Sequence, residues 1–319
     1  MLRASADTNH PTHALFPMIA DASSAQNRKR GRVLVGLSGA VMSLGAPLIR
    51  LLEEADAWQF LTFRSFAVIA VVSIWLVVRY GRNVTLAFRA GGFDALLGGA
   101  LLSVAFVAIV FSFLSTTIAN ALLLLSTAPL MTALLGWMVL GERPSKWSWG
   151  AIAIAIIGAF IMVADGVARG DVFGDAMALC AAMGFACYSV VIRRGRHTDM
   201  LPAVFYAGII SAVVASVGAV TIGIGLQPNA WDIGVSLCYG AVGISGGLIL
   251  YTLGSKHLPA AELNVLSLGE VVLGPLWVWL AFAETPTTQT LVGGAVILSA
   301  VALQASGSMW SEQQSTERA

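Results

Sequence analysis

A carboxylate lies deep inside a long apolar stretch of this 319-residue sequence. Glu270 stands near the middle of residues 260–282, and at helical spacing it shares a face with Ser267 and Trp277. An ionisable group is costly in such surroundings, so it is a functional candidate by default. Its carboxylate could bind an ammonium group or exchange a proton. The alternative is a structural glutamate that caps the backbone freed by Pro275.

Other polar and aromatic side chains in the apolar stretches could complete a binding site. A site for an amphipathic metabolite needs apolar walls and a few placed hydrogen-bonding groups. The candidate lining residues are Met42, Ser43, Phe106, Phe111, Ser126, Thr127, Tyr188, Tyr251, Ser267, Glu270 and Trp277. The candidate gate residues are Asn120, Glu262 and Asn264. Packing is the alternative for each aromatic residue, and interfacial solvation is the alternative for Glu262 and Asn264.

Prolines and an arginine complete the set of candidates. Pro47, Pro129 and Pro275 are candidate hinges, because each removes an intrahelical hydrogen bond within an apolar stretch. Arg64 lies about two turns inside another stretch, and we expect its side chain to extend outward to the acidic residues that precede it. Attraction of a substrate carboxylate is the alternative role for Arg64.

Motifs for catalysis or for a bound cofactor are not recognisable. The sequence contains no Walker loop, no zinc-type His/Glu or Cys cluster and no nucleophile motif in a suitable context. The 4 histidines lie in predicted tails or loops, which disfavours a histidine proton relay. We therefore expect a protein that is not an enzyme and that uses neither a cofactor nor a metal.

The composition indicates which solvent surrounds these elements. Hydrophobic residues make up 57% of the chain and charged residues 11%, whereas a soluble domain is about a quarter charged. Such a chain cannot cover a soluble surface, so a soluble enzyme and a disordered tether are excluded. The net charge of +1 provides no field for polyanions, which argues against a nucleic-acid partner. The lipid bilayer is the expected partner.

Ten apolar stretches are each about as long as the 20 residues that a membrane-spanning helix needs. They are residues 33–51, 58–79, 93–115, 118–140, 147–165, 174–192, 201–225, 231–253, 260–282 and 288–306. The segments 1–31 and 307–319 are predicted to be tails, the first of them disordered. All of the 18 basic residues except Arg50, Arg64 and Arg169 fall on one side of this topology. The positive-inside rule therefore places both termini in the cytoplasm.

An internal repeat relates the two halves of the chain. At an offset of 142 residues, Glu142 aligns with Glu284 and Pro144 aligns with Pro286. The repeats are predicted to cover residues 32–165 and 172–306. Each contains five spans, and because five is odd the second copy enters the membrane from the opposite side. Inverted repeats are typical of carriers with a site between the halves; a duplicated structural bundle is the alternative.

Two segments resemble a known family. APLMTALLGWMVLGERPSKWSWGAIAIAIIGAFIM resembles the fourth and fifth helices of the EamA-type drug/metabolite transporter superfamily, and GDAMALCAAMGFACYSVVIRR resembles its sixth helix. The resemblance implies a ten-helix basket of 5+5 inverted repeats that moves small metabolites, most often outward. A bacterial exporter of aromatic amino acids is the member to compare first. The usual Glu-Pro of the ninth helix is Glu270-Val271 here, with the proline displaced to Pro275.

We expect a secondary transporter in a bacterial inner membrane that works by alternating access. The expected substrate is a small metabolite, with aromatic or apolar amino acids as the first choice for export. The alternative within this class is a proton-coupled antiporter of drugs or metabolites, with the proton as coupling ion. The alternatives from another class are a membrane channel and a scaffold without transport activity. The oligomeric state is left open.

Overall fold

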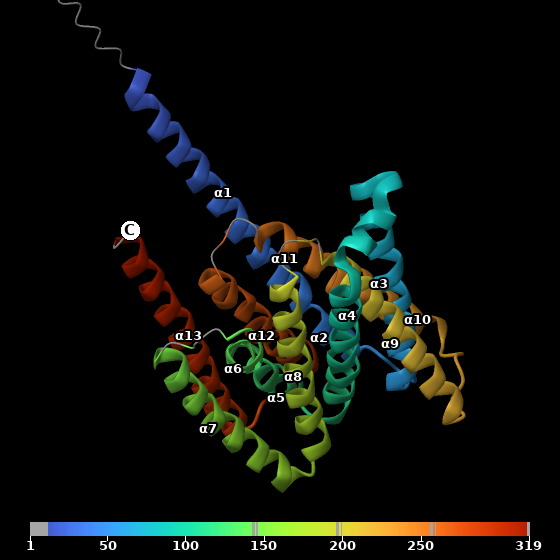
Figure 1. Ribbon diagram of the computed structural model, residues 1–319. Helices are drawn as coiled ribbons and strands as arrows, with labels where there is room; N and C mark the ends of the chain where they lie inside the picture. The colour runs from blue at the N-terminus through green and yellow to red at the C-terminus, as the bar shows by residue number, and fades with distance from the viewer. Residues whose placement is uncertain are drawn as a thin grey trace, which may run out of the picture.

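The computed structural model describes the backbone of residues 12–141, 144, 146–195, 198, 200–255, 258 and 260–317. The side chains of residues 12–25, 255, 260–265, 267 and 307–317 are outside the description. Within the described part, every regular element is helical (Figure 1).

The first half of the chain carries eight helical elements. They are α1 (Thr12–Ser43), α2 (Gly45–Arg50), α3 (Ala57–Tyr80), the 3-10 helix η1 (Gly81–Asn83), α4 (Val84–Ser115), α5 (Ile118–Leu125), α6 (Ala128–Leu140) and α7 (Lys146–Arg169). The second half carries α8 (Val172–Arg194), α9 (Leu201–Thr221), α10 (Ala230–Cys238), the π-helix η2 (Tyr239–Gly246), α11 (Gly247–Ser255), α12 (Ala260–Phe282) and α13 (Thr288–Glu317). Thus α1 and α13 both extend into the segments for which the sequence predicts tails.

Eight stretches of the described chain are long and apolar enough to cross a membrane. One of them, Ala57–Ser115, is 59 residues long and would measure about 90 Å as a single helix. It contains α3 and α4, which lie side by side (Figure 1). Gly81 between them and Gly92 inside α4 have φ angles of 53° and 50°, which residues with a side chain rarely adopt.

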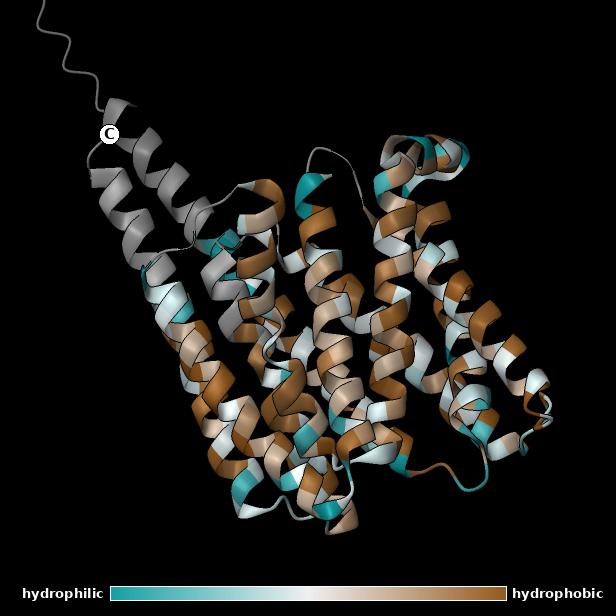
Figure 2. Ribbon diagram, turned by 60° about the horizontal axis from the view of Figure 1, so that its bottom comes forward, coloured by the Kyte–Doolittle hydropathy of each residue, from teal (hydrophilic) through white to brown (hydrophobic). Residues whose placement is uncertain are grey.

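The outward-facing surface of the helices is apolar. Ile74, Val78 and Phe160 are 64%, 77% and 74% exposed, which in water would be an aggregation hazard. Figure 2 shows apolar residues along the length of the helices and hydrophilic residues gathered mainly towards their ends. This distribution suits a lipid surround, so the protein is a multi-pass integral membrane protein.

Several apolar stretches are interrupted near their middle. Leu44 separates α1 from α2, and Ser126 and Thr127 separate α5 from α6. Each break comes a few residues before a predicted hinge proline, Pro47 or Pro129, because a proline ring clashes with the carbonyl four residues earlier. The third predicted hinge differs, since Pro275 lies inside the unbroken α12.

Helices from the two halves pack against each other throughout the molecule. The main packing partners are α4 with α8 and α9, α3 with α9, α7 with α13, and α1 with α11 and α12. Small residues allow close approach: a Cβ added at Gly158 of α7 would lie 2.7 Å from the carbonyl oxygen of Gly293 of α13. The interface between the halves is therefore tightly packed.

Candidate functional site

The break between α1 and α2 lies against α11 and α12. A Cβ added at Gly39 would lie 3.4 Å from the backbone nitrogen of Glu270, whose side chain is partly buried. The indole Nε1 of Trp277 donates a hydrogen bond to Oγ of the buried Ser43 at 3.0 Å. A Cβ added at Gly247 would lie 2.2 Å from Cγ of Met42. The structure thus brings the predicted residues Met42, Ser43, Glu270 and Trp277 to one region.

The predicted tyrosines form a separate pair. Tyr188 interacts electrostatically with Tyr251, and Tyr251 interacts in the same way with Arg193 near the end of α8. The ring of Tyr188 also packs edge-on against Phe185, with ring centroids 6.0 Å apart. These contacts place the pair towards the ends of α8 and α11, whereas Glu270 belongs to α12.

The other predicted lining residues make local contacts. Phe111 packs edge-on against Trp58 and Phe173, with ring centroids 4.7 and 6.3 Å apart. The hydroxyls of Ser126 and Thr127 donate to backbone carbonyls within α5, at 2.6 and 2.7 Å. None of these contacts joins the three residues to Glu270. Their role as lining stays a prediction.

Asn120, a predicted gate residue, is fully buried at one end of the molecule. Its Nδ2 donates to Oδ1 of Asp175 and to Oγ1 of Thr116, and its Oδ1 accepts from Oγ1 of Thr290. The side chains of the other gate candidates, Glu262 and Asn264, and that of the lining candidate Ser267 lie outside the described residues.

Ion pairs surround Asn120 at the same end. Nε of Arg50 lies 2.8 Å from Oε2 of Glu284, and Oε1 of Glu284 accepts from the backbone N–H of Ile118. Arg169 contacts Asp165 and Asp171 at 3.1 and 3.0 Å. We name as the polar cluster the residues Arg50, Thr116, Asn120, Asp165, Arg169, Asp175, Glu284, Thr287 and Thr290. It ties α2, α5, α7, α8 and α13 together at this end.

Arg64, whose position the sequence analysis predicted wrongly, lies near the break between α1 and α2. Arg64 is fully buried, and none of its guanidinium nitrogens has a hydrogen-bond partner in the structure. Its Cζ lies 4.8 Å from the ring centroid of Phe106 and 5.8 Å from that of Tyr239. The expectation that Arg64 extends outward to the preceding acids is therefore wrong.

The acidic loop at residues 53–56, which we expected to contact Arg64, is hydrogen-bonded to Asp232 instead. The fully buried carboxylate of Asp232 accepts hydrogen bonds from the backbone N–H groups of Glu53, Glu54 and Ala55, at 2.7 to 2.9 Å. Burying an unpaired ion such as Arg64 costs several kcal/mol, of which a desolvated cation–π contact returns about 2 kcal/mol. The burial of the Arg64 charge therefore lowers the stability of the folded protein.

Sequence reasoning also gave no role to Tyr239 and Asp175. The ring of Tyr239 stacks on that of Phe60, with centroids 5.5 Å apart, and belongs to the π-helix η2. π-helical turns occur frequently at functional sites. The signal for Asp175 was a carboxylate one turn inside an apolar helix, whereas no sequence pattern marked the π-helix.

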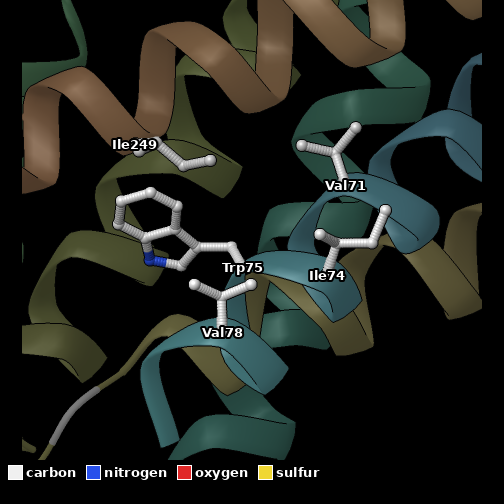
Figure 3. Close-up of a pocket in the computed structure, with 5 residues that line it drawn as sticks. All are labelled: Val71, Ile74, Trp75, Val78 and Ile249. Carbon is white, nitrogen blue, oxygen red and sulfur yellow. The ribbon is translucent and has the colours of Figure 1, made fainter.

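The hollow in Figure 3 is a different feature. It is an apolar depression of about 170 Å³ lined by Val71, Ile74, Trp75 and Val78 of α3 and by Ile249 of α11. None of these five residues belongs to the predicted lining. Its walls are the apolar side chains that suit contact with lipid.

Interrupted apolar helices with polar residues buried at their breaks are typical of membrane transport proteins. The sequence profile of the EamA-like transporter family matches the chain twice, over residues 29–164 and 172–305. The chain belongs to this family, part of the drug/metabolite transporter superfamily.

Named relatives include transporters. The uncharacterized transporter YwfM of Bacillus subtilis (strain 168) is 29% identical over 164 residues, which cover 48% of this chain and 52% of YwfM. The uncharacterized membrane protein YMR253C of Saccharomyces cerevisiae is 22% identical, over 60% of this chain and 51% of that protein. The chain thus spans about half the length of these two relatives. Human solute carrier family 35 member G1 is 22% identical, over 86% of this chain and 78% of its own.

A solved crystal structure shares the fold. It aligns with a TM-score of 0.62 at 17% sequence identity, covering 86% of this chain and 96% of the other. This similarity concerns the fold alone. The expected closeness to an exporter of aromatic amino acids stays a prediction.

Proposed function

We propose that the chain crosses the membrane ten times as two inverted five-helix repeats, residues 32–165 and 172–306, and works as an alternating-access secondary transporter. The pattern of helix packing carries this proposal. If the repeats are exchanged, the pair α4·α8 maps onto α11·α1, and α6·α8 maps onto α12·α1. The pairs α3·α9 and α7·α13 map onto themselves, and each of these pairs is observed. A two-fold axis in the membrane plane would generate this pattern.

The region around Glu270 supports a substrate site between the repeats. Glu270 and Trp277 come from α12 in the second repeat, and Met42 and Ser43 come from α1 in the first. A carboxylate beside an indole and a hydroxyl offers an ionic contact, an apolar surface and a hydrogen bond to one small molecule. An amino acid with an aromatic or apolar side chain has complementary groups, and we propose its export.

The polar cluster is proposed as the outer gate. Its ion pairs join helix ends on one side of the bundle, and this supports a role in separating the region around Glu270 from solvent. The charge bias of the sequence makes this the outer end, with both termini cytoplasmic in a bacterial inner membrane. Glu262 and Asn264 at the start of α12 are proposed for the inner gate.

Counterflow in proteoliposomes tests the transport proposal. Vesicles are loaded with unlabelled L-phenylalanine, L-leucine or L-alanine, and uptake of the labelled compound is followed. A transporter gives a transient accumulation above equilibrium, which a channel cannot give. A scaffold shows no protein-dependent flux. The absence of accumulation with every amino acid of the panel would refute amino-acid exchange.

The Glu270→Gln variant tests coupling to protons. A facilitator carrying this substitution still equilibrates substrate, and its rate stays independent of an imposed pH gradient. A proton antiporter loses the acceleration that the gradient gives to the wild type. Asp94→Asn removes an acid from the partly exposed ion pair with Arg194 and serves as the control.

A further inference from the structure

The side chain of Arg64 is enclosed by elements from both halves of the chain. A Cβ added at Gly240 of η2 would lie 2.2 Å from the carbonyl oxygen of Arg64, so the π-helix packs directly on α3 at this residue. Phe106 of α4 and Tyr239 of η2 supply the rings near the guanidinium. The guanidinium thus lies inside the bundle, and the backbone of Arg64 lies about 10 Å along α3 from its first residue.

Among the described residues, Arg64 supplies three of the eight buried side-chain polar atoms that lack a hydrogen-bond partner, more than any other residue. Buried polar groups are almost always hydrogen-bonded, and Arg50 and Arg169 both have carboxylate partners. In Arg64, by contrast, Nε, Nη1 and Nη2 all lack a partner while the residue is 0% exposed. Aromatic rings can contact the faces of a guanidinium, but they do not use the N–H groups in its plane. Those N–H groups form a fork that matches a carboxylate.

We infer that Arg64 binds the carboxylate of the transported metabolite beside the rings of Phe106 and Tyr239. This inference rests on the proposed transport function and extends it to the anionic group of the substrate. Glu270 supplies the opposite charge: Tyr239 lies near both Arg64 and Glu270, yet Arg64 has no hydrogen bond to Glu270. A zwitterion with its carboxylate at Arg64 and its ammonium towards Glu270 satisfies both charges.

Thermal unfolding of the purified protein with three related probes tests this site. L-phenylalanine carries both charges, 3-phenylpropionate carries the carboxylate alone, and phenethylamine carries the ammonium alone. The first two are expected to stabilise the wild type and the third is not. In Arg64→Gln the concentration for half-maximal stabilisation should rise roughly tenfold or more, as when one partner of a buried charged pair is truncated.

Control variants separate binding from structure. Arg194→Gln removes a charge from a side chain that is 65% exposed and should leave probe binding unchanged. Arg64→Lys keeps the charge without the planar fork, so it should bind with intermediate affinity, and it replaces Arg64→Gln if that variant fails to fold. Without ligand, Arg64→Gln should unfold at the same temperature as the wild type or higher, because an unpaired buried charge has been removed.

Specific outcomes overturn the inference. Failure of both carboxylate probes to stabilise the wild type overturns it, as does wild-type affinity in Arg64→Gln and Arg64→Lys. Carboxylate-selective binding that depends on Arg64, without any counterflow, would refute the transport proposal and leave this site standing. Counterflow that Arg64→Gln does not alter would leave transport standing and remove the site.

Discussion

The polar cluster and the surroundings of Arg64 both contain arginines within an apolar bundle, but the arginines differ in their partners. In the polar cluster, Arg50 and Arg169 lie within 3.1 Å of carboxylate oxygens. At Arg64, the guanidinium lies against the rings of Phe106 and Tyr239 and has no carboxylate partner among the described residues. Charges with partners hold helices together, whereas the charge of Arg64 has no carboxylate partner and is available to a substrate. The predictions below test this difference.

The largest effect is expected at Asp232, a fully partnered buried charge. Asp232→Ala leaves three backbone N–H groups of the loop after α2 without their acceptor. We expect a loss of about 3 to 5 kcal/mol in the free energy of unfolding, measured by unfolding in detergent. Glu53→Gln changes an exposed side chain of the same loop and should cost less than about 0.5 kcal/mol. Equal losses in the two variants would contradict the structural role of Asp232.

The ion pair between Arg50 and Glu284 should give a smaller effect. Their side chains are 23% and 21% exposed, so solvent screens part of the attraction, and we expect a coupling energy of about 1 kcal/mol. Unfolding of Arg50→Gln, Glu284→Gln and the double variant measures it. If this pair also closes the outer gate, each single variant should raise the labelling of cysteines placed near Ser43 from the outer side. Zero coupling together with unchanged labelling would remove the pair from the gate.

The smallest effect on stability is expected at the hinge prolines. Pro129→Ala combined with Pro275→Ala restores one backbone donor at the break between α5 and α6 and one within α12, so both apolar stretches should stiffen. Exchange in proteoliposomes should slow several-fold while the unfolding temperature is retained. Pro202→Ala is the matched control, because Pro202 also lies in the first turn of its helix, but α9 does not continue a preceding apolar helix as α6 continues α5. An unchanged exchange rate would show that these prolines are not hinges.

The positions of the helices could be predicted from the sequence, because an apolar stretch of about 20 residues has a single stable solution in lipid. The span predicted at 118–140 is observed as Ile118–Leu140, and the span predicted at 93–115 begins next to the kink at Gly92. Hydropathy alone did not place the π-helix from Tyr239 to Gly246, since its register depends on packing against α3.

The candidate site could be predicted in part. Glu270 stood out because a carboxylate in an apolar stretch is conspicuous, and Ser43 and Trp277 do lie within hydrogen-bonding distance of each other. The direction of Arg64 could not be deduced, because a sequence does not tell which face of a helix meets lipid and which meets other helices. Proximity in sequence suggested the carboxylates of Glu53 and Glu54 as partners of Arg64, but in the fold these side chains are exposed and their backbone N–H groups bind Asp232.

The inverted repeat is tested most directly by labelling equivalent loops from each side of the membrane. Cys180, Cys187 and Cys238 are first replaced by alanine, and single cysteines are then introduced as Arg82→Cys and Ile224→Cys, which are 142 positions apart. A membrane-impermeant maleimide should label Ile224→Cys from the outer side and Arg82→Cys from the cytoplasmic side alone. Labelling of both cysteines from the same side would contradict inverted repeats and, with them, the shared site between the halves.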